Sequence, residues 1–168
     1  MKILHLTNSM NPAYGGLSTF LHALAPALTA HGHPSEIVSL DAADCAFLRA
    51  IPAPVHALGP VKHGFGYAPK LAAWLALNFS RFDAVIVHGL WQYPGFATLH
   101  AAQRIRPTVP YFVFTHGMLD PWFRRTYPLK HLRKLAYWFL AERRILRRAV
   151  AVLFTHLPGT QQRRYTER

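Results

Sequence analysis

Five short runs of apolar residues constrain the fold of this chain more than any other feature of its sequence. The runs are nearly continuous, without the alternation of apolar and polar residues that is typical of a strand with one face in water. Segments with helical spacing separate them. This pattern predicts an α/β fold, namely a Rossmann-like parallel sheet with helices on both faces and right-handed crossovers. The five runs cover residues 2–6, 35–40, 83–89, 110–117 and 149–155.

The intervening segments predict helices and one loop-rich stretch. Apolar residues follow helical spacing from Leu17 to Ala30, where Pro26 should kink the helix and Gly32 should cap its end. The Pro and Gly residues of 41–66 predict loops, with one short strand near Val55. Further helices are expected at 68–80, 93–105 and 130–148.

Length and composition indicate one packed domain. The chain has 168 residues, of which 51% are hydrophobic and 15% charged, so a sizeable core can form. Cys45 is the single cysteine, which excludes an intrachain disulfide and favours a reducing compartment. No apolar run approaches the ~20 residues of a membrane span, and the N-terminus becomes polar too early for a signal peptide. We therefore expect a cytoplasmic protein.

The positive charge is concentrated in the second part of the chain. The net charge is +12, and residues 104–168 carry fourteen Lys or Arg against three Asp or Glu. Such an uneven field suits a polyanionic partner: nucleic acid, an anionic membrane or a phosphorylated substrate.

Three of the expected strands end in residues that suit a ligand. The first leads to Gly15 and Gly16, the others end in His88-Gly89 and His116-Gly117. Ligands of open parallel sheets bind outside the carboxyl ends of the strands, where glycine permits close approach and histidine supplies a donor, an acceptor or a proton. Five other histidines are interpreted as surface or structural residues: His5, His31, His33, His100 and His131. Without a Cys pair or an H-E-x-x-H pattern, no metal is expected.

Several stretches, in this order, resemble the N-terminal domain of bacterial family 4 glycosyltransferases. These are retaining nucleotide-sugar enzymes with two Rossmann-like domains, the GT-B architecture. The most specific match is HGLW at 88–91 followed by HGMLDPW at 116–122. The matching stretches are KILHLTNSMNPAYGGLSTFLHALAPALTAHGH at 2–33, FDAVIVHGLWQYPG at 82–95, PYFVFTHGMLDPWFRR at 110–125 and KHLRKLAYWFLAERRILRRAVAVLFT at 130–155.

The resemblance implies roles for the matched positions. His116 would contact the reacting sugar and donate hydrogen bonds around the transferred group, with Gly117 beside it. Gly15 and Gly16 would lie near the diphosphate and the acceptor, and His88 and Trp91 would face the acceptor. Asp120 precedes Pro121 and is expected to hold the loop rather than perform chemistry. The nucleotide sugar is a substrate, so the resemblance implies no cofactor and no metal.

The chain also departs from the family. Such enzymes are about twice as long, and their second domain binds the nucleotide through a paired-glutamate motif that is absent from these 168 residues. We expect residues 1–155 to form the domain and residues 156–168 a polar tail left by a truncation, a frameshift or a deliberately shortened chain. On this interpretation the chain alone would not transfer sugar.

The basic segment supports a further expectation. The residues Leu132, Leu135, Ala136, Phe139, Leu140 and Leu146 form an apolar stripe, with cations largely off it. One interpretation is a patch for an anionic membrane, which would make the protein peripheral on the inner face of the cytoplasmic membrane. One alternative is that the stripe packs on the sheet and the cations stay solvated, and another is a nucleic-acid surface, although no nucleic-acid module is recognised. For the chain as a whole, the alternative to an enzyme domain is a non-catalytic Rossmann-like module that binds a membrane or a partner protein. The expected patch comprises Trp122, Phe123, Arg124, Arg125, Arg133 and Lys134.

Overall fold

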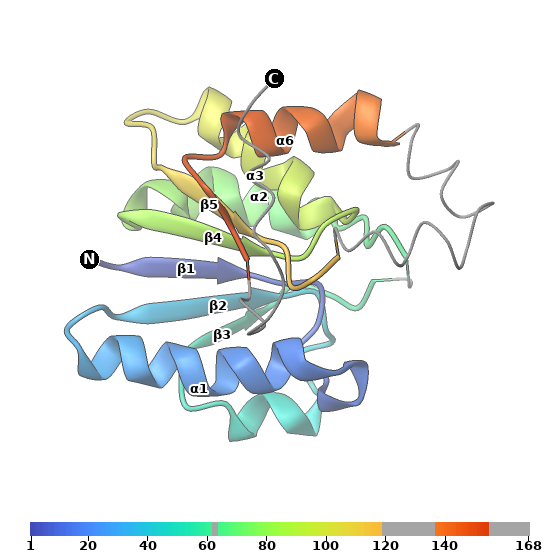
Figure 1. Cartoon of the computed structure of the whole chain (residues 1–168). Helices are drawn as coiled ribbons and strands as arrows, with labels where there is room; N and C mark the ends of the chain where they lie inside the picture. Colours follow the sequence, from blue (N-terminus) through green and yellow to red (C-terminus); the bar gives the residue numbers. More distant parts are fainter. Residues whose placement is uncertain (62–63, 119–136, 155–168) are drawn as a thin grey trace, which may run out of the picture.

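The centre of the molecule is a six-stranded sheet in the order β3-β2-β1-β4-β5-β6 (Figure 1). The structure, a computed structural model, describes residues 1–61, 64–118 and 137–154. Every pair of neighbouring strands is parallel, which confirms the parallel α/β sheet expected from the apolar runs. The strands are β1 (Ile3–Leu6), β2 (Ser35–Ser39), β3 (Val55–Ala57), β4 (Ala84–His88), β5 (Tyr111–Phe114) and β6 (Val152–Leu153).

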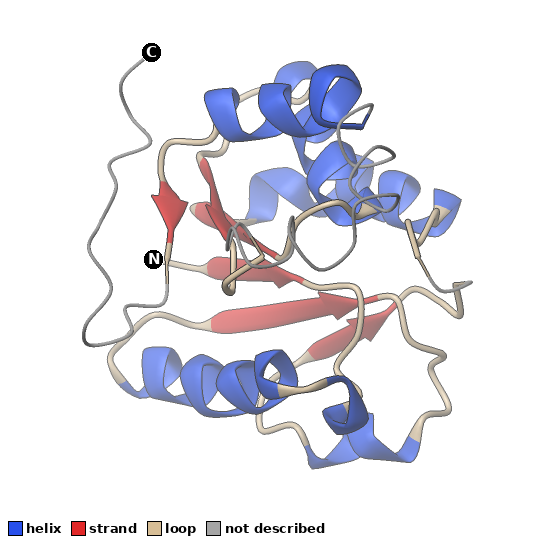
Figure 2. Ribbon diagram, turned by 45° about the vertical axis from the view of Figure 1, so that its right-hand side comes forward, coloured by secondary structure: helices blue, strands red, loops and turns tan. Residues whose placement is uncertain are grey.

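Helices cover both faces of this sheet (Figure 2). On one face α1 (Gly16–Ala30) packs Leu21 and Ala25 into a small core with Ile37 of β2. On the other face lie α2 (Pro69–Asn78), α3 (Tyr93–Arg104) and α6 (Arg143–Arg148), over a larger core that includes Leu4 and Val85. Three short 3-10 helices, η1 (Pro12–Tyr14), η2 (Ala46–Ala50) and η3 (Phe79–Arg81), complete the connections. Both faces of β1 and β2, and nearly all of β4, are therefore buried, as their continuous apolar runs predicted, whereas β3 and β6 at the edges of the sheet are half-buried.

The direction of strand order reverses between β1 and β4. From β1 the chain adds strands on one side through β2 and β3, then returns to the other side for β4, β5 and β6. In doubly wound sheets the carboxyl ends of the strands at this reversal are the usual place for a ligand. The strands that end there are β1 and β4, with β5 next to β4.

Most expected elements are present, and the differences are local. The helix from Gly16 to Ala30 continues through Pro26, and Gly32 follows it with a φ of +80°, as a helix-ending glycine should. The last strand was expected over 149–155, but β6 includes only Val152 and Leu153. Residues 156–168 lie outside the described part of the chain.

The basic helix is the largest departure from expectation. Its described part begins with a π-helical segment, η4 (Trp138–Glu142), which continues into α6. In this segment Glu142 and Ile145 are buried, whereas Phe139 and Leu140 are 64% and 74% exposed. The alternative in which the apolar stripe packs on the sheet therefore does not hold for Phe139 and Leu140.

Candidate active site

Three histidines form a continuous hydrogen-bonded row across neighbouring strands at the carboxyl edge of the sheet. Nδ1 of His5 lies 3.0 Å from Nε2 of His88, and Nδ1 of His88 lies 2.9 Å from Nε2 of His116. His5 comes from β1, His88 ends β4, and His116 follows β5. The row thus begins at the reversal of strand order and ends at the loop that carries His116.

Two phenylalanines hold the outer ring of this row. The ring of Phe114 stacks on His116 at 4.3 Å between centroids, with 18° between the ring planes. Phe20 of α1 meets the same imidazole edge-on at 5.3 Å and lies 6.2 Å from His88. Helix α1 therefore covers the row, and its first turn lies on the same side of the sheet.

Burial keeps all three histidines neutral. Desolvation lowers the pKa of His5 to about 4 and that of the half-buried His116 to about 4. His88 is 1% exposed, and burial, with smaller repulsion from His5 and His116, lowers its pKa well below the ordinary value. At neutral pH the outer ring can donate or accept a hydrogen bond, but it does not supply a positive charge.

The backbone at the two His-Gly loops is unusual. Trp91 and His116 have φ angles of +64° and +47°, and they are the non-glycine residues with positive φ in the described part of the chain. A left-handed conformation costs a non-glycine residue free energy, and such residues cluster at functional sites. Gly89 and Gly117 beside them have φ angles of +94° and +75°, which favour glycine.

Hydrogen bonds join the two loops to each other and to the basic helix. The Gly89 N–H donates to the Phe114 carbonyl at 2.9 Å, and the Leu90 N–H lies 3.2 Å from Sδ of Met118. The Trp91 N–H donates to Oε2 of Glu142 at 3.2 Å. These contacts hold the strained turns of both loops in one arrangement.

Glu142 is a buried carboxyl that the sequence analysis missed. It is 2% exposed, and burial raises its pKa to about 7, although the hydrogen bond from the Trp91 N–H partly opposes this shift. No ion pair with Glu142 is present among the described residues. It is the last residue of the π-helical segment η4.

Gly15 and Gly16 lie at the start of α1, as expected. Gly15 has a φ of +107°, which an L side chain rarely adopts. Apart from the flanking residues and the backbone of α1, no atom of the described residues lies within 4 Å of the place that a Cβ would occupy at either glycine. The loop before them is held by Asp41, whose Oδ2 accepts from the Met10 N–H at 2.7 Å. The two glycines therefore leave open space in front of the helix N-terminus, where backbone N–H groups favour anions.

An aromatic hollow adjoins the Trp91 end of the site. It has a volume of about 590 Å³, and apolar side chains from the loop before α2, from α3 and from η4 line it. Trp91 connects this hollow to the HGLW loop, and the ring of Trp138 lies 5.9 Å from that of Trp91. The lining residues are Phe65, Tyr67, Trp91, Tyr93, Phe96, Tyr137, Leu140 and Ala141.

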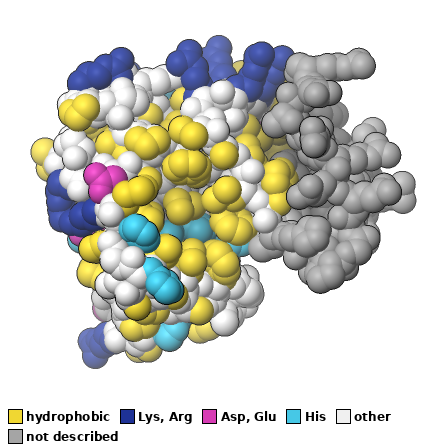
Figure 3. All heavy atoms as spheres, turned by 60° about the vertical axis from the view of Figure 1, so that its left-hand side comes forward, with side chains coloured by type: hydrophobic (Ala, Val, Ile, Leu, Met, Phe, Trp, Pro, Cys, Tyr) yellow, Lys and Arg dark blue, Asp and Glu magenta, His cyan; other side chains and the backbone are white. Residues whose placement is uncertain are grey.

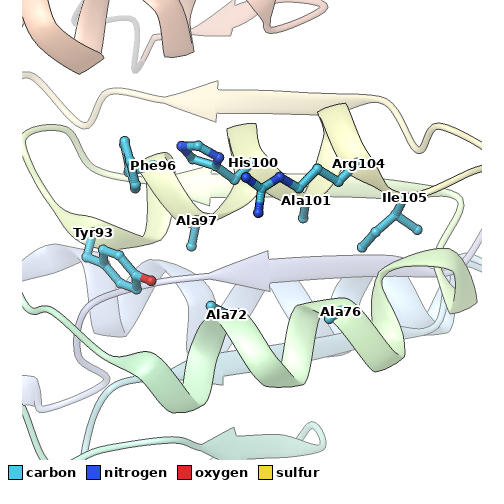
Figure 4. A pocket seen from close by; sticks show the side chains of 9 residues that line it. All are labelled: Ala72, Ala76, Tyr93, Phe96, Ala97, His100, Ala101, Arg104 and Ile105. Carbon is cyan, nitrogen blue, oxygen red and sulfur yellow. The ribbon is translucent and has the colours of Figure 1, made fainter.

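A second hollow, of about 350 Å³, lies between α2 and α3 and away from the histidine row (Figure 4). Phe96, His100 and Arg104 line its α3 side, and Ala72 and Ala76 line its α2 side. None of the residues that the sequence analysis singled out as site residues lines it. We therefore place the candidate site at the histidine row and not in this groove.

The structure brings together most of the expected site residues. His116, Gly117 and Trp91 lie on two loops that are hydrogen-bonded to each other, and Phe20 connects α1 to them. His88 was expected to face an acceptor, but it lies buried one ring behind His116. His5 was interpreted as surface or structural, although it is the inner member of the row. Its sequence pattern, a lone histidine in an apolar strand, is shared with structural histidines and so did not single it out.

Other expectations fall on residues that the structure does not describe. Asp120 and the proposed membrane patch, Trp122, Phe123, Arg124, Arg125, Arg133 and Lys134, lie outside the described residues. Within residues 1–61, 64–118 and 137–154, no cluster of three or more His, Cys, Asp or Glu is arranged to hold a metal ion. In the same part of the chain, every helix is too short or too polar to cross a bilayer.

The comparison with protein families agrees with the fold. The model of one family, described as the glycosyl transferase 4-like domain, matches residues 15–163. A comparison with curated proteins found no match. The match begins at the glycine pair, includes both His-Gly loops, and covers well over half of the chain. The chain therefore belongs to the family of glycosyl transferase 4-like domains.

Proposed function

We propose that this chain is the acceptor-side domain of a retaining glycosyltransferase that uses a nucleotide sugar, and that His116 contacts the transferred sugar. Family membership supports glycosyl transfer in general, with binding of a nucleotide sugar and a glycan acceptor. The observation that carries the assignment of the site is the place of His116. It follows β5 at the carboxyl edge of the sheet, beside the reversal of strand order, in a strained left-handed conformation.

The chemistry of the site suits stabilisation by hydrogen bonds rather than proton transfer. His116 is neutral at pH 7 because burial lowers its pKa to about 4. A neutral imidazole whose inner nitrogen is occupied by His88 presents one nitrogen to a ligand. Such a group can hydrogen-bond a sugar hydroxyl or an oxygen on which negative charge develops as the sugar leaves its diphosphate.

The start of α1 supplies the second part of the proposed site. Gly15 and Gly16 leave open space in front of the helix N-terminus, where backbone N–H groups and the helix dipole favour an anion. In this proposal the diphosphate of the donor approaches these glycines, while the acceptor lies near Trp91. As the resemblance implies, the nucleotide itself would be held by a second domain.

A binding experiment tests this proposal. Calorimetric titration with a panel of nucleoside diphosphate sugars and glycan acceptors should find at least one ligand. The variant His116→Ala should weaken its binding about tenfold or more, the free energy of one good hydrogen bond. His31→Ala, which removes an exposed histidine at the end of α1, is the matched control and should bind as the wild type does. No binding to any member of the panel, or equal binding by both variants, would overturn the proposal.

A membrane role is a second proposal, favoured by the exposed face of the basic helix. Phe139 and Leu140 are 64% and 74% exposed, directly before the exposed Arg143 and Arg144. Figure 3 shows Lys and Arg side chains along the upper margin of the molecule, where Figure 1 places α6. Apolar side chains beside cations suit the surface of an anionic bilayer, as an enzyme with a lipid-linked acceptor would need.

Vesicle co-sedimentation tests the membrane role. The protein should bind vesicles that contain anionic lipid and ignore neutral ones, and about 1 M salt should release it because the Debye length falls to about 3 Å. Replacing Phe139 and Leu140 by Ser should weaken binding, whereas Leu77→Ser should not, although Leu77 on α2 is 81% exposed. Equal binding to neutral vesicles, or none to either kind, would contradict the proposal.

A further inference from the structure

We propose that His5 and His88 are positioning residues that fix the tautomer of His116, so that its Nδ1 carries the proton and acts as a hydrogen-bond donor. The inference rests on the proposed function only for the identity of the ligand: a sugar hydroxyl or an anionic oxygen would accept this hydrogen bond. The tautomer itself follows from the geometry of the row, which is a property of the unliganded chain.

The first step is to count protons along the row. Each neutral imidazole has one N–H and one lone pair, and each N···N contact requires one of each. The contacts of 3.0 Å and 2.9 Å join His5 to His88 and His88 to His116. Only two arrangements satisfy both contacts. Either all three rings carry the proton on Nδ1 and donate outward, or all three carry it on Nε2 and donate inward.

The inner end of the row decides between the two arrangements. Nε2 of His5 is buried and has no hydrogen-bond partner among the described residues. Inward donation would place an N–H on this atom, and a buried N–H without an acceptor is rarer in proteins than an acceptor that lacks a donor. Outward donation leaves only a lone pair there, so the row favours a proton on Nδ1 of each ring.

Among the described residues, no charged group contacts the row in a way that would change this count. Helix α1, which covers the row, contains no Asp, Glu, Lys or Arg, and its single histidine, His22, contacts the Ala50 carbonyl instead. The described contacts of the three imidazoles include no carboxylate. In the familiar catalytic triad, a carboxylate orients a histidine and stabilises its cation. Here two neutral imidazoles orient a third and leave it uncharged.

Two phenylalanines keep the imidazole ring of His116 in the orientation that its hydrogen bond to His88 requires. Stacking on Phe114 and the edge contact with Phe20 fix the plane of the His116 ring, while His88 occupies its Nε2. A flip of the ring would break the 2.9 Å contact and leave Nδ1 of the buried His88 without a partner. The hydrogen bonds therefore determine which nitrogen of His116 is protonated, as they do for oriented histidines in general.

Long-range ¹H–¹⁵N correlation spectra of the imidazoles test the tautomer directly, without any ligand. At pH 7 the wild-type chain should show His5, His88 and His116 mainly in the Nδ1–H form, although free histidine favours Nε2–H. Scalar coupling across the hydrogen bonds should identify His5 as donor to His88, and His88 as donor to His116. A His116 that is mainly Nε2–H would overturn the proposal, whether or not any variant folds.

Variants of the innermost residue test the rule that sets the direction of the row. His5→Phe leaves the buried Nε2 of His88 without a partner, so the same rule keeps a lone pair there and His116 should remain mainly Nδ1–H. His5→Asn retains an N–H close to the position of Nδ1 and should also keep the wild-type tautomer. His31→Ala is the control. A change of His116 to mainly Nε2–H in His5→Phe, with amide spectra that show a folded chain, would contradict the rule.

The two proposals can fail separately. If the tautomer of His116 is as expected but no sugar or nucleotide sugar binds, the proposed function is wrong and the proposal about the tautomer is confirmed. If a sugar binds in a His116-dependent manner while His116 is mainly Nε2–H, the proposal about the tautomer is wrong and the proposed function is supported.

Discussion

The ionisable groups at the two ends of the sheet lie in opposite environments: a carboxylate is paired with cationic groups at one end, and, among the described residues, a carboxyl is buried without them at the other. Near the amino ends of the strands, the carboxylate oxygens of Glu36 lie 2.6 Å from Nζ of Lys2, 2.7 Å from Nε2 of His56 and 3.4 Å from Nη2 of Arg81. Partial burial would raise the pKa of the Glu36 carboxyl, but its hydrogen bonds and charge interactions with Lys2 and His56 outweigh this and lower the pKa. At the carboxyl edge, Glu142 is buried without an ion pair among the described residues.

This difference separates residues that stabilise the fold from residues that are held ready for a ligand. A carboxylate with paired cations contributes to stability at neutral pH. A carboxyl with a raised pKa, histidines with lowered pKa values and left-handed non-glycine residues either reduce the free energy of unfolding or do not increase it. Such groups gather at functional sites. The carboxyl edge therefore has the energetic character of a binding site, and the amino end has that of a structural cluster.

The largest expected effect is a gain in stability from Glu142→Gln. Folding raises the pKa of this carboxyl from 4.5 to about 7, so the folded state holds a proton that the unfolded state releases between these values. Stability therefore falls as pH rises from 4.5 to 7. The neutral amide avoids this cost and should stabilise the protein by about 3 kcal/mol at pH 8.

Urea unfolding at pH 8 and pH 5 measures this gain. It should shrink strongly at pH 5, where Glu142 is already protonated in the folded state. A loss of stability at pH 8 would show that the ionised carboxylate is paired and that the two ends of the sheet are alike.

The second effect concerns the acid limb of the stability curve. His5 has a folded pKa of about 4 against 6.5 unfolded, so its contribution is present above pH 6.5 and is lost as pH falls toward 4. In His5→Asn this loss is absent. Between pH 7 and pH 4.5 the variant should lose about 2–3 kcal/mol less stability than the wild type.

Urea titrations of the two proteins at both pH values provide the check, and His31→Ala should follow the wild-type curve. If His5→Asn and the wild type lose the same stability on acidification, His5 is not held neutral by the fold.

A smaller loss is expected at the amino end. Glu36→Gln removes the carboxylate from Lys2, His56 and Arg81, and should cost about 1–2 kcal/mol at pH 7, because these partners are partly exposed. The folded pKa of Glu36 is lowered, so its contribution is present above pH 4.5 and is lost as pH falls below that value. Chemical unfolding at pH 7 and pH 3.5 should show a smaller cost at the lower pH. An equal cost at both would indicate lost packing instead of lost charge.

The smallest effect on stability is expected from His116→Ala. Its imidazole is partly exposed at the end of the row, so truncation should change the free energy of unfolding by less than about 1 kcal/mol. Thermal or urea unfolding would show this. A loss several times larger would mean that His116 belongs to the core and would remove the contrast between the two ends.

The sequence predicted the fold because each apolar run was buried on both faces, which leaves little choice of strand arrangement. It also predicted His88 and His116, since each stands where an apolar run meets a glycine. The partnership with His5 was not predictable, because it depends on β1 and β4 being neighbours, 83 residues apart in sequence. A single histidine inside an apolar strand has the same pattern as a structural one.

The basic helix shows a limit of periodicity. Helical spacing placed Phe139 and Leu140 on one apolar stripe, but it did not determine whether that stripe faces the sheet. In the structure Ala141, Glu142 and Ile145 are buried, and Phe139 and Leu140 are exposed. The contact from the Trp91 N–H to Glu142 forms only in the folded protein, so the sequence pattern carries no signal for it.

The most direct test of the central claim is to map where a ligand binds. Backbone ¹H–¹⁵N spectra recorded during titration with a nucleotide sugar or glycan found by calorimetry should change at three loops of the carboxyl edge. These are residues 15–17, 89–91 and 116–118, and signals of Lys2, Glu36 and Arg81 should not move. Changes confined to the amino end, or to the groove between α2 and α3, would contradict the assignment of the active site to the histidine row.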